Sequence, residues 1–561
     1  MKKILLAAAV SLTAATVFLG APYYLGGQAQ KSLETQHRIL ADTFFFDVVS
    51  HEYDRGWFSS TETTVIRFHP AVLANISDQL PDNLKTVLDK PVTMTNHVRH
   101  GLFADGIRPV RAVVETEFGY DPEVKKALAR FFGEQVPVSA RNVLFLSGGG
   151  KLSVKVSPFD YEELSGIKLG WKGLEAAVDY REGFTEYDSR FTLPGFSATL
   201  ADKGSITLEN IEVKSRTRTG KSGISLGSSE TALGRFKVEW KEKLDYKLRL
   251  NELVNMVTNL QVGAFINPNG EIPPNSVSLE NLSYRTQTDE TGSYIGSRGV
   301  FGFAKLNYGE RQYGPLAIDI LAEHLNAKSL ADLKTRLQQI SAEKHDDGEA
   351  RKLVLATMRK EGAGLLTDNP VLQIRQFDFN APSGHVKVNG RFELKGLKAD
   401  DLENFQAMIR KTHAVLNMDI SQNLLEEFFI TQASSLFAME DPNSEQEKQE
   451  IRDTIRMMIS QTVENMNKDG YLQQTDGTVK TQLKIADNTI TLNGKAFTAP
   501  QDDDLFAGLE DDENRRNASA PAPQPASAAA SAASDARGHR EASSAARAEH
   551  PASHAAASAA P

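Results

Sequence analysis

Apolar and polar residues alternate along much of the first 300 residues, and this alternation predicts β-strands. From 110 to 118 the even positions are Val, Ala, Val, Thr and Phe, whereas the odd positions include Arg111, Glu115 and Glu117. A period of two is typical of a strand that buries one face. Similar runs occur at 63–68, 142–146, 151–156, 191–200, 205–213, 234–240 and 277–285. Turn clusters such as Ser147-Gly148-Gly149-Gly150 separate the runs, so we predict an extended antiparallel sheet rather than βαβ units.

From about residue 319 the spacing changes to that of helices. Residues typical of helices, among them Leu, Ala, Glu and Lys, recur at helical spacing in 320–339, 349–360, 399–413, 421–437 and 445–465. Two β-hairpins are also predicted in this half. A two-residue turn at Asp487-Asn488 would set Ile485 opposite Ile490, and a three-residue loop at 388–390 would set Val386 opposite Phe392.

The N-terminus has the pattern of a membrane anchor. Lys2 and Lys3 precede an uncharged run from 4 to 25, and the next charge is Lys31. These 22 residues would span about 33 Å as a helix, enough for a bilayer core. The two lysines would keep the N-terminus in the cytoplasm and the main body outside it. The alternative is a cleaved signal peptide, but Gly27-Gln28-Ala29 is a poor cleavage site, so we expect an uncleaved signal anchor.

Small residues follow one helical face of this segment. Ala7, Ser11 and Ala15 are spaced four residues apart, which would let two such helices approach closely. We therefore expect a homodimer contact through these three residues, although alanine is also common in such segments for no special reason.

Composition excludes several classes of function. The chain has 561 residues with Lys+Arg 63 against Asp+Glu 73, a net charge of −10, and no cysteine. An acidic protein lacks the basic surface that a nucleic-acid partner requires. Without cysteine there are no disulfides, thiol nucleophiles or cysteine-ligated metals. We expect no nucleic acid as partner and no cofactor.

The last 61 residues differ from the rest. Residues 501–504 begin an acidic linker, and 518–561 are almost wholly Ala, Ser, Pro and scattered charges. Such a segment buries too little apolar surface to offset its conformational entropy, so we expect disorder. The predicted fold class is α+β: a transmembrane helix (1–25), an extended antiparallel β-rich body (26–318), a helix-rich C-terminal half (319–500) and a disordered tail (501–561).

Several short motifs occur in the order seen in a known family. They are Tyr53-Asp54-Arg55-Gly56-Trp57-Phe58-Ser59-Ser60, His100-Gly101-Leu102, Tyr313-Gly314-Pro315-Leu316 and Asn369-Pro370. Over residues 1–495 the chain resembles the YdgA-like bacterial proteins of unknown function, apart from Leu102 where those proteins have proline. The resemblance implies an inner-membrane-anchored protein with a periplasmic body, and it supplies no catalytic residues.

Candidate catalytic and metal motifs are weak. Gly223-Ile224-Ser225-Leu226-Gly227 matches the G-x-S-x-G pattern, which requires a strand-to-helix turn that exposes the serine. Its flanks do not predict that turn. Residues 465–476 have the spacing of a calcium loop, but the segment that follows reads as a β-hairpin rather than a helix. We therefore predict no catalytic, cofactor-binding or metal-ligating residues.

Two functional hypotheses remain. The first is a non-enzymatic envelope protein whose β-rich body binds a lipidic molecule or a protein partner. Its candidate surface comprises Tyr53, Trp57 and Phe58, although the latter two are also expected as core aromatics of the first strand. The alternative is an extracytoplasmic hydrolase that uses Ser225.

The composition of the tail gives a first testable prediction. Truncation after Gln501 should leave the thermal unfolding midpoint unchanged, because the removed residues offer almost no apolar surface to bury. Differential scanning calorimetry of the full and truncated chains checks this. A marked fall in the midpoint would show that the tail packs on the body.

Overall fold

A computed structural model describes most of the chain up to residue 497. The described residues are 20–38, 46–69, 88–106, 108–241, 275–342, 353–354, 356–358, 360–398, 400–401, 404–433 and 445–497. Residues Met1–Thr498 form one compact unit and the remaining residues a second, which lies outside the described ranges. The expected disorder of the tail therefore stays a prediction.

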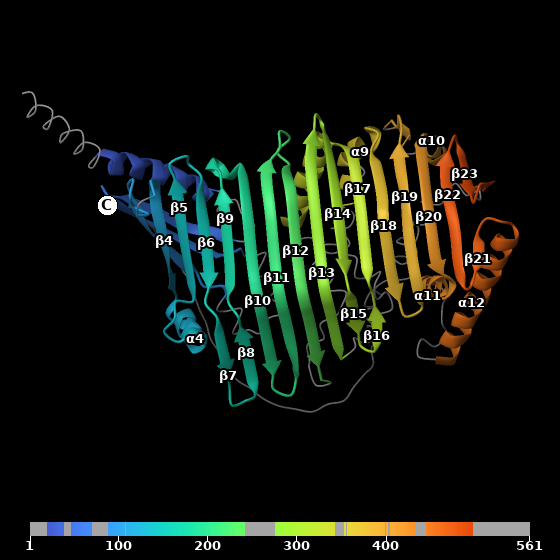
Figure 1. The fold of residues 1–561 in the computed structure, drawn as a ribbon, viewed down its shortest axis with the longest axis horizontal. Coiled ribbons are helices and arrows are strands. Elements are labelled where there is room, and N and C mark those ends of the chain that lie inside the picture. The colour runs from blue at the N-terminus through green and yellow to red at the C-terminus, as the bar shows by residue number, and fades with distance from the viewer. Residues whose placement is uncertain are drawn as a thin grey trace, which may run out of the picture. The chain divides into compact units, whose positions relative to one another are not determined.

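One antiparallel sheet runs through the described part of the first unit (Figure 1). Hydrogen-bonded neighbours are nearly always neighbours in sequence, so the sheet is a long meander. Its principal strands, in spatial order, are β1 (Phe46–Arg55), β2 (Ser59–Phe68), β3 (Val92–His100), β4 (Val110–Tyr120), β5 (Val138–Phe145), β6 (Gly150–Val156), β9 (Leu174–Tyr180), β10 (Glu186–Leu200), β11 (Gly204–Thr219), β12 (Ser225–Trp240), β13 (Ser276–Thr291), β14 (Tyr294–Phe303), β17 (Leu316–Asn326), β18 (Val371–Ala381), β19 (Gly384–Leu394), β20 (Thr412–Ser421), β22 (Thr478–Ala486), β23 (Thr489–Leu492) and β24 (Lys495–Ala496).

Five short strands complete the sheet in the described residues. They are β7 (Phe159–Glu162), β8 (Ile167–Trp171), β15 (Lys305–Tyr308), β16 (Arg311–Tyr313) and β21 (Gln473–Thr475). Strand β9 pairs with the first half of β10 and β8 pairs with its second half. In the same way, β15 pairs with the first residues of β13 and β14 pairs with the rest of that strand. The four central strands β10 to β13 have 15 or 16 residues each, a length of about 50 Å.

The alternation of apolar residues changes phase in the middle of these long strands. In β11 the apolar positions are Ile206 and Leu208 before Asn210, and Ile211 and Val213 after it. Asn210 has φ 55°, a left-handed conformation that reverses the direction of the side chains beyond it. The hydrogen-bonded register is the same on both sides of Asn210, so the strands stay paired while the phase shifts.

Equivalent breaks occur side by side on the neighbouring strands. The line of breaks crosses the sheet at Gly173, Pro194, Asn210, Gly234, Asn281 and Ala304. Asn281 has φ 53°, like Asn210. A Cβ at Gly234 would lie 3.1 Å from the Cβ of Asn210, so the close approach at this line favours glycine. The apolar side chains consequently remain on one face along the whole length of each strand.

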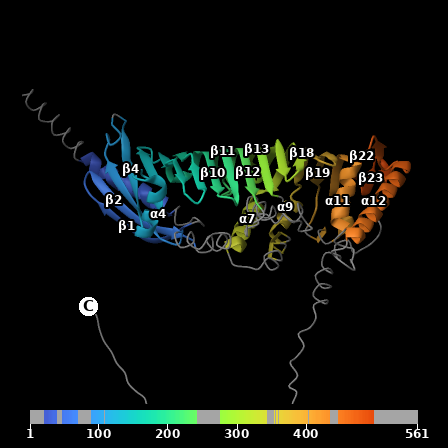
Figure 2. The ribbon, with the colours of Figure 1, turned by 90° about the horizontal axis from the view of Figure 1, so that it is seen from below.

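The described helices are α4 (Pro122–Phe132), α7 (Ala327–Ala342), α9 (Ala363–Thr367), α10 (Phe405–Lys411), α11 (Gln422–Ala433), α12 (Glu445–Lys468) and an N-terminal helix at residues 20–38. Figure 2, which looks along the strands, shows α7, α9, α11 and α12 on one side of the sheet. Helices α7 and α9 contact β17, α11 contacts β19 and β20, and α12 contacts β21.

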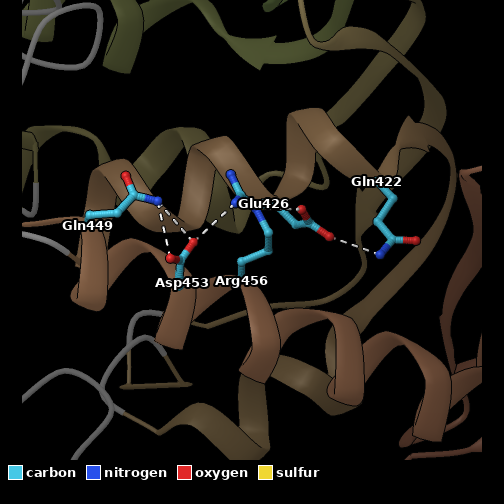
Figure 3. Close-up of polar contacts among 5 residues, drawn as sticks. All are labelled: Gln422, Glu426, Gln449, Asp453 and Arg456. Carbon is cyan, nitrogen blue, oxygen red and sulfur yellow. Dashed lines mark hydrogen bonds and ion pairs between the residues drawn. The ribbon is translucent and has the colours of Figure 1, made fainter.

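Helices α11 and α12 are joined by a partly buried polar network (Figure 3). The carboxylate of Glu426, which is only 8% exposed, accepts a 2.9 Å hydrogen bond from Gln422 and lies 3.5 Å from Nε of Arg456. Arg456 also contacts Asp453 on its own helix. Below the network, Ile459 and Val463 of α12 pack against Val479 of β22, so this helix pair covers the C-terminal end of the sheet.

The expected membrane anchor is corrected by the structure. Residues 20–25 belong to the same helix as residues 26–38. Leu25 of this helix is only 8% exposed, so its side chain is buried in the protein. Within the described ranges, no helix is both long enough and apolar enough to cross a bilayer. A single-pass inner-membrane protein with a periplasmic body is therefore not supported. Residues 1–19, including the stripe of Ala7, Ser11 and Ala15, lie outside the described residues.

The fold class is corrected as well, from α+β with a helix-rich C-terminal half to a mostly antiparallel sheet. The helix expected at 320–339 is strand β17 followed by α7, and that expected at 399–413 contains only the short α10 before β20. The helices at 421–437 and 445–465 are confirmed by α11 and α12. The domain boundary proposed at 318/319 falls inside β17, which pairs with strands from both sides of that boundary.

One of the two predicted hairpins is confirmed. Ile485 pairs with Ile490 across the turn at Asp487-Asn488, as expected. The predicted loop at 388–390 is wrong, because β19 runs without interruption from Gly384 to Leu394. In that strand Val386 pairs with Phe379 of β18 rather than with Phe392.

The line of phase breaks gives a second prediction. Replacing Asn210 by Val should lower the free energy of unfolding by about 1–3 kcal/mol, because a β-branched residue is strained at φ 55°. Asn210→Gly is the matched control and should change the stability by only a few tenths of a kcal/mol, because glycine tolerates this conformation. Urea unfolding measures both. Equal losses for the two variants would contradict the proposed role of the backbone conformation.

Candidate functional site

The apolar residues of the long strands form one continuous surface, here called the apolar face. Directly paired residues lie on the same side of a sheet, so the register defines rows that cross many strands. One row comprises Phe191, Val213, Thr231, Tyr284, Phe301, Ile318, Phe377, Val388 and Met418. Beyond the phase breaks, a second row on the same face comprises Trp171, Phe196, Leu208, Phe236, Leu279 and Leu306.

Much of this face is only half-buried. Tyr284, Ile320 and Leu372 keep 45%, 38% and 42% of their surface exposed, and the central residues Leu208 and Phe236 are half-buried. Large exposed apolar surfaces are uncommon on a folded chain and typically mark a site of interaction. The apolar face is therefore the principal candidate for a binding surface.

The opposite face of the same strands carries ion pairs. Arg190 and Lys214 both contact the carboxylate of Glu212, at 2.6 and 2.8 Å. Arg216 lies 2.9 Å from Asp188, and Arg298 donates two hydrogen bonds to Asp319. Each exposed pair contributes little to stability. Together they make this face hydrophilic, so the two faces of the sheet differ sharply in chemistry.

The N-terminal helix covers the apolar face at one end of the sheet. Its Ala29 and Leu33 are 0% and 4% exposed and pack in a core with Val98, Val114 and Leu144. The row that contains Val98 and Val114 continues through Asn142, Leu152 and Val178 to Ser189 of β10. The helix therefore lies on the same face as the apolar rows of β10 to β19.

Polar side chains from β1 to β3 hold the start of this helix. The guanidinium of Arg55 donates a 2.6 Å hydrogen bond to the carbonyl of Tyr23. Nδ1 of His100 lies 2.9 Å from the carbonyl of Pro22 and Nε2 lies 3.1 Å from Oγ of Ser60. A carbonyl only accepts, so Nδ1 carries the proton and Nε2 accepts from Ser60. A Cβ at Gly26 would lie 2.7 Å from the His100 ring, so glycine is needed for this contact.

The three residues predicted as a binding surface occupy two environments. Tyr53 is half-buried and packs against the core below the N-terminal helix, and burial raises the pKa of its hydroxyl. Trp57 and Phe58 are 52% and 54% exposed in the turn between β1 and β2, where the Trp57 ring lies 4.9 Å from that of Tyr23. The expectation that both are core aromatics is wrong, because they fall in the turn and not in a strand.

A second polar cluster lies beside His100. Glu62 is 3% exposed, and its carboxylate contacts Nε2 of His51 at 2.9 Å and accepts a 2.7 Å hydrogen bond from Asn96. The rings of His37 and His51 stack at 3.8 Å, and burial lowers the pKa of His37. Within the described ranges, no group of three acidic, histidine or cysteine side chains is placed to hold a metal ion.

Ser225 begins strand β12 and is exposed. The residues before it form the β11–β12 hairpin turn and those after it form a strand, so the strand-to-helix context of a nucleophile elbow is not formed. No hydrogen bond joins Ser225 to a histidine or a carboxylate among the described residues. In the part of the chain that the structure describes, Ser225 therefore has no hydrogen-bonded base of the kind that activates a serine nucleophile.

Comparison with known proteins identifies the family. A family model described as a bacterial protein of unknown function (DUF945) matches residues 1–500. The chain belongs to the DUF945 family. A search of curated proteins finds no match. Membership agrees with the broader part of the predicted resemblance, which was to an uncharacterised bacterial family.

In this DUF945 chain, two of the four motifs that carried the resemblance meet at the N-terminal helix. Tyr53, Arg55 and Ser60 come from one motif and His100 from another, and all four lie below or beside that helix. These two motifs therefore have a structural explanation as the docking site of the helix. Sequence reasoning missed this arrangement, because it assigned residues 20–25 to a membrane anchor.

The buried His100 gives a prediction on pH. Burial lowers the pKa of this imidazole in the folded protein, so the unfolded chain takes up its proton at a higher pH. The stability contributed by neutral His100 is therefore complete above about pH 6.5 and declines as the pH falls, by at most about 1.4 kcal/mol per pH unit. Denaturant unfolding at pH 7.5 and 5.5 measures the decline.

The variant His100→Gln tests this prediction. It should reduce the difference in unfolding free energy between the two pH values. An identical difference in wild type and His100→Gln would rule out His100 as its source.

Proposed function

We propose that this DUF945 protein is a non-enzymatic binding protein that holds the hydrocarbon part of a lipidic molecule on its apolar face. The observation that carries the proposal is the line of phase breaks from Gly173 to Ala304. The breaks occur at six neighbouring positions across the sheet, and they keep the large apolar side chains of these strands on one face. The resulting apolar surface is wider than a single buried core requires. The YdgA-like resemblance is retained as part of this proposal and adds no activity to it.

The energetics suit a hydrocarbon ligand. Burial contributes about 0.8 kcal/mol per CH₂ group, so a twelve-carbon chain gains about 9 kcal/mol before the entropic cost of binding is subtracted. No charge pairing is needed for such binding. The competing occupant of the apolar face is a hydrophobic segment of a protein partner. Unlike a hydrocarbon chain, such a segment needs hydrogen-bond partners for its backbone N–H and C=O groups.

The proposal predicts that 1-dodecanol binds the purified protein in the micromolar range, measured by displacement of a fluorescent acyl probe. The double variant Tyr284→Thr with Ile320→Thr should weaken binding about five- to tenfold, because two half-exposed apolar side chains leave the face. Threonine retains a β-branched side chain suited to a strand, and both positions are partly exposed, so folding should be preserved.

Two controls separate binding from catalysis and from general damage. Arg285→Thr changes the neighbour of Tyr284 on the opposite face and should leave the affinity unchanged. Ser225→Ala should also have no effect on binding. If the face variants bind normally, or if Ser225→Ala abolishes a measurable hydrolysis that the face variants retain, the proposal is wrong.

A further inference from the structure

A buried arginine lies where the apolar face meets the N-terminal helix. Arg111 is 8% exposed, in an otherwise apolar stretch of β4. Its Nη1 donates to Oγ of Ser32 at 2.7 Å and to the carbonyl of Gln28 at 3.4 Å, and its Nη2 donates to the carbonyl of Leu146 at 3.1 Å. All three acceptors are neutral.

The charge of Arg111 has no carboxylate partner in the described part of the chain. No ion pair there includes this residue, and its Nε is buried without a hydrogen-bond acceptor. An unpaired buried charge is costly, and buried charges in proteins are normally paired. A guanidinium that lines a cavity and lacks a carboxylate partner is well suited to carboxylate or phosphate oxygens.

Such a cavity is present beside Arg111. A pocket of about 120 Å³ is lined by Arg111, by Ser32, Thr35 and Gln36 of the N-terminal helix, and by Tyr180. This volume holds a carboxylate or a phosphate group. Gln36, Tyr180 and Asn142 are hydrogen-bonded to one another at 2.8–2.9 Å, so this wall of the pocket is already ordered. Exposed Lys31 and Glu182 also line the pocket, and their opposite charges roughly cancel.

A run of aromatic side chains leads from the pocket to the apolar face. Phe184 also lines it, and its ring stacks on that of Tyr180 at 4.2 Å. On its other side the Phe184 ring meets Tyr187 of β10 at 6.4 Å. Tyr187 pairs with Tyr180 and lies on the same face as Phe191, four residues along the strand, where the first apolar row begins. A chain leaving the pocket would therefore meet aromatic side chains and then the row.

We propose that the pocket at Arg111 binds the anionic head group of an amphiphile whose hydrocarbon chain lies on the apolar face. The ligand class is a long-chain carboxylate or phosphate ester with a small head. This inference rests on the proposed function, because it supplies the polar end of the same ligand. The head group accepts hydrogen bonds from Arg111 and Ser32, and it supplies the negative charge that the buried guanidinium lacks.

The test compares ligands that share a chain and differ in charge. Laurate, 1-dodecanol and dodecylammonium are titrated into the full-length protein, with sodium acetate as the head group alone, and affinities are measured by probe displacement. Laurate should bind at least about tenfold more tightly than 1-dodecanol, as charge-assisted hydrogen bonds are the stronger kind. Dodecylammonium should bind more weakly than both, and acetate alone should not compete with the probe.

Three variants connect the preference to the pocket. Arg111→Gln should abolish the preference for laurate over 1-dodecanol. Because Arg111 is buried and its loss threatens folding, two exposed positions provide independent tests. Lys31→Gln should weaken laurate binding about two- to fivefold and Glu182→Gln should strengthen it by a similar factor, since each changes one charge at the pocket. Both effects are measured as the ratio of laurate affinity to 1-dodecanol affinity.

The outcomes distinguish this inference from the proposed function. Equal binding of laurate and 1-dodecanol would overturn the anion site and leave the apolar face as the binding surface. Shifts of laurate affinity opposite to those expected for Lys31→Gln and Glu182→Gln would also overturn it. Competition by acetate as strong as that by laurate would show a site for a free anion and refute the coupling to a chain. Failure of every twelve-carbon ligand to bind would refute the proposed function itself.

Discussion

The structure depends on one constraint: strands of up to 16 residues must keep their apolar side chains on a single face of an open sheet. In a strand of uniform geometry simple alternation achieves this, but a left-handed residue in mid-strand requires the alternation to change phase with it. Here the chain reverses its side-chain direction once in each long strand, at Asn210, Gly234 and Asn281 and at the matching positions of their neighbours. Because the breaks lie side by side, the hydrogen-bonded ladder continues across them.

A helix closes the apolar face at each of its two ends. At the N-terminal end a helix packs Ala29 and Leu33 into the sheet and is held by Arg55, His100 and Arg111. At the C-terminal end α12 packs Val463 on the sheet and is tied to α11 through buried Glu426. Both closures combine apolar packing with buried polar contacts, which fix a helix in one register where apolar packing alone would let it slide.

Sequence reasoning found most of the strands and missed their extent. Strands were expected at 205–213 and 234–240, whereas β11 reaches Thr219 and β12 begins at Ser225. For β12 the predicted strand begins at Gly234, where the alternation changes phase. A prediction that relies on a period of two assumes uniform strand geometry, so it takes this change of phase as the end of a strand. Trp57 and Phe58 are exposed, and their role as a binding surface stays a prediction. The apolar face depends on pairing between strands distant in sequence, which no local pattern reports.

Arg111 had a visible signal, a single cation within Val110-Arg111-Ala112-Val113-Val114, but alternation assigned it to the solvent side. The structure places it against the helix instead, because the register of β4 and β5 shifts between Val110 and Ala112 and turns the side chain toward Ser32. A bulge that redirects a charge inward has no value for stability unless the charge finds partners. Its position beside the N-terminal helix is what connects the irregularity of the backbone to the binding that we propose.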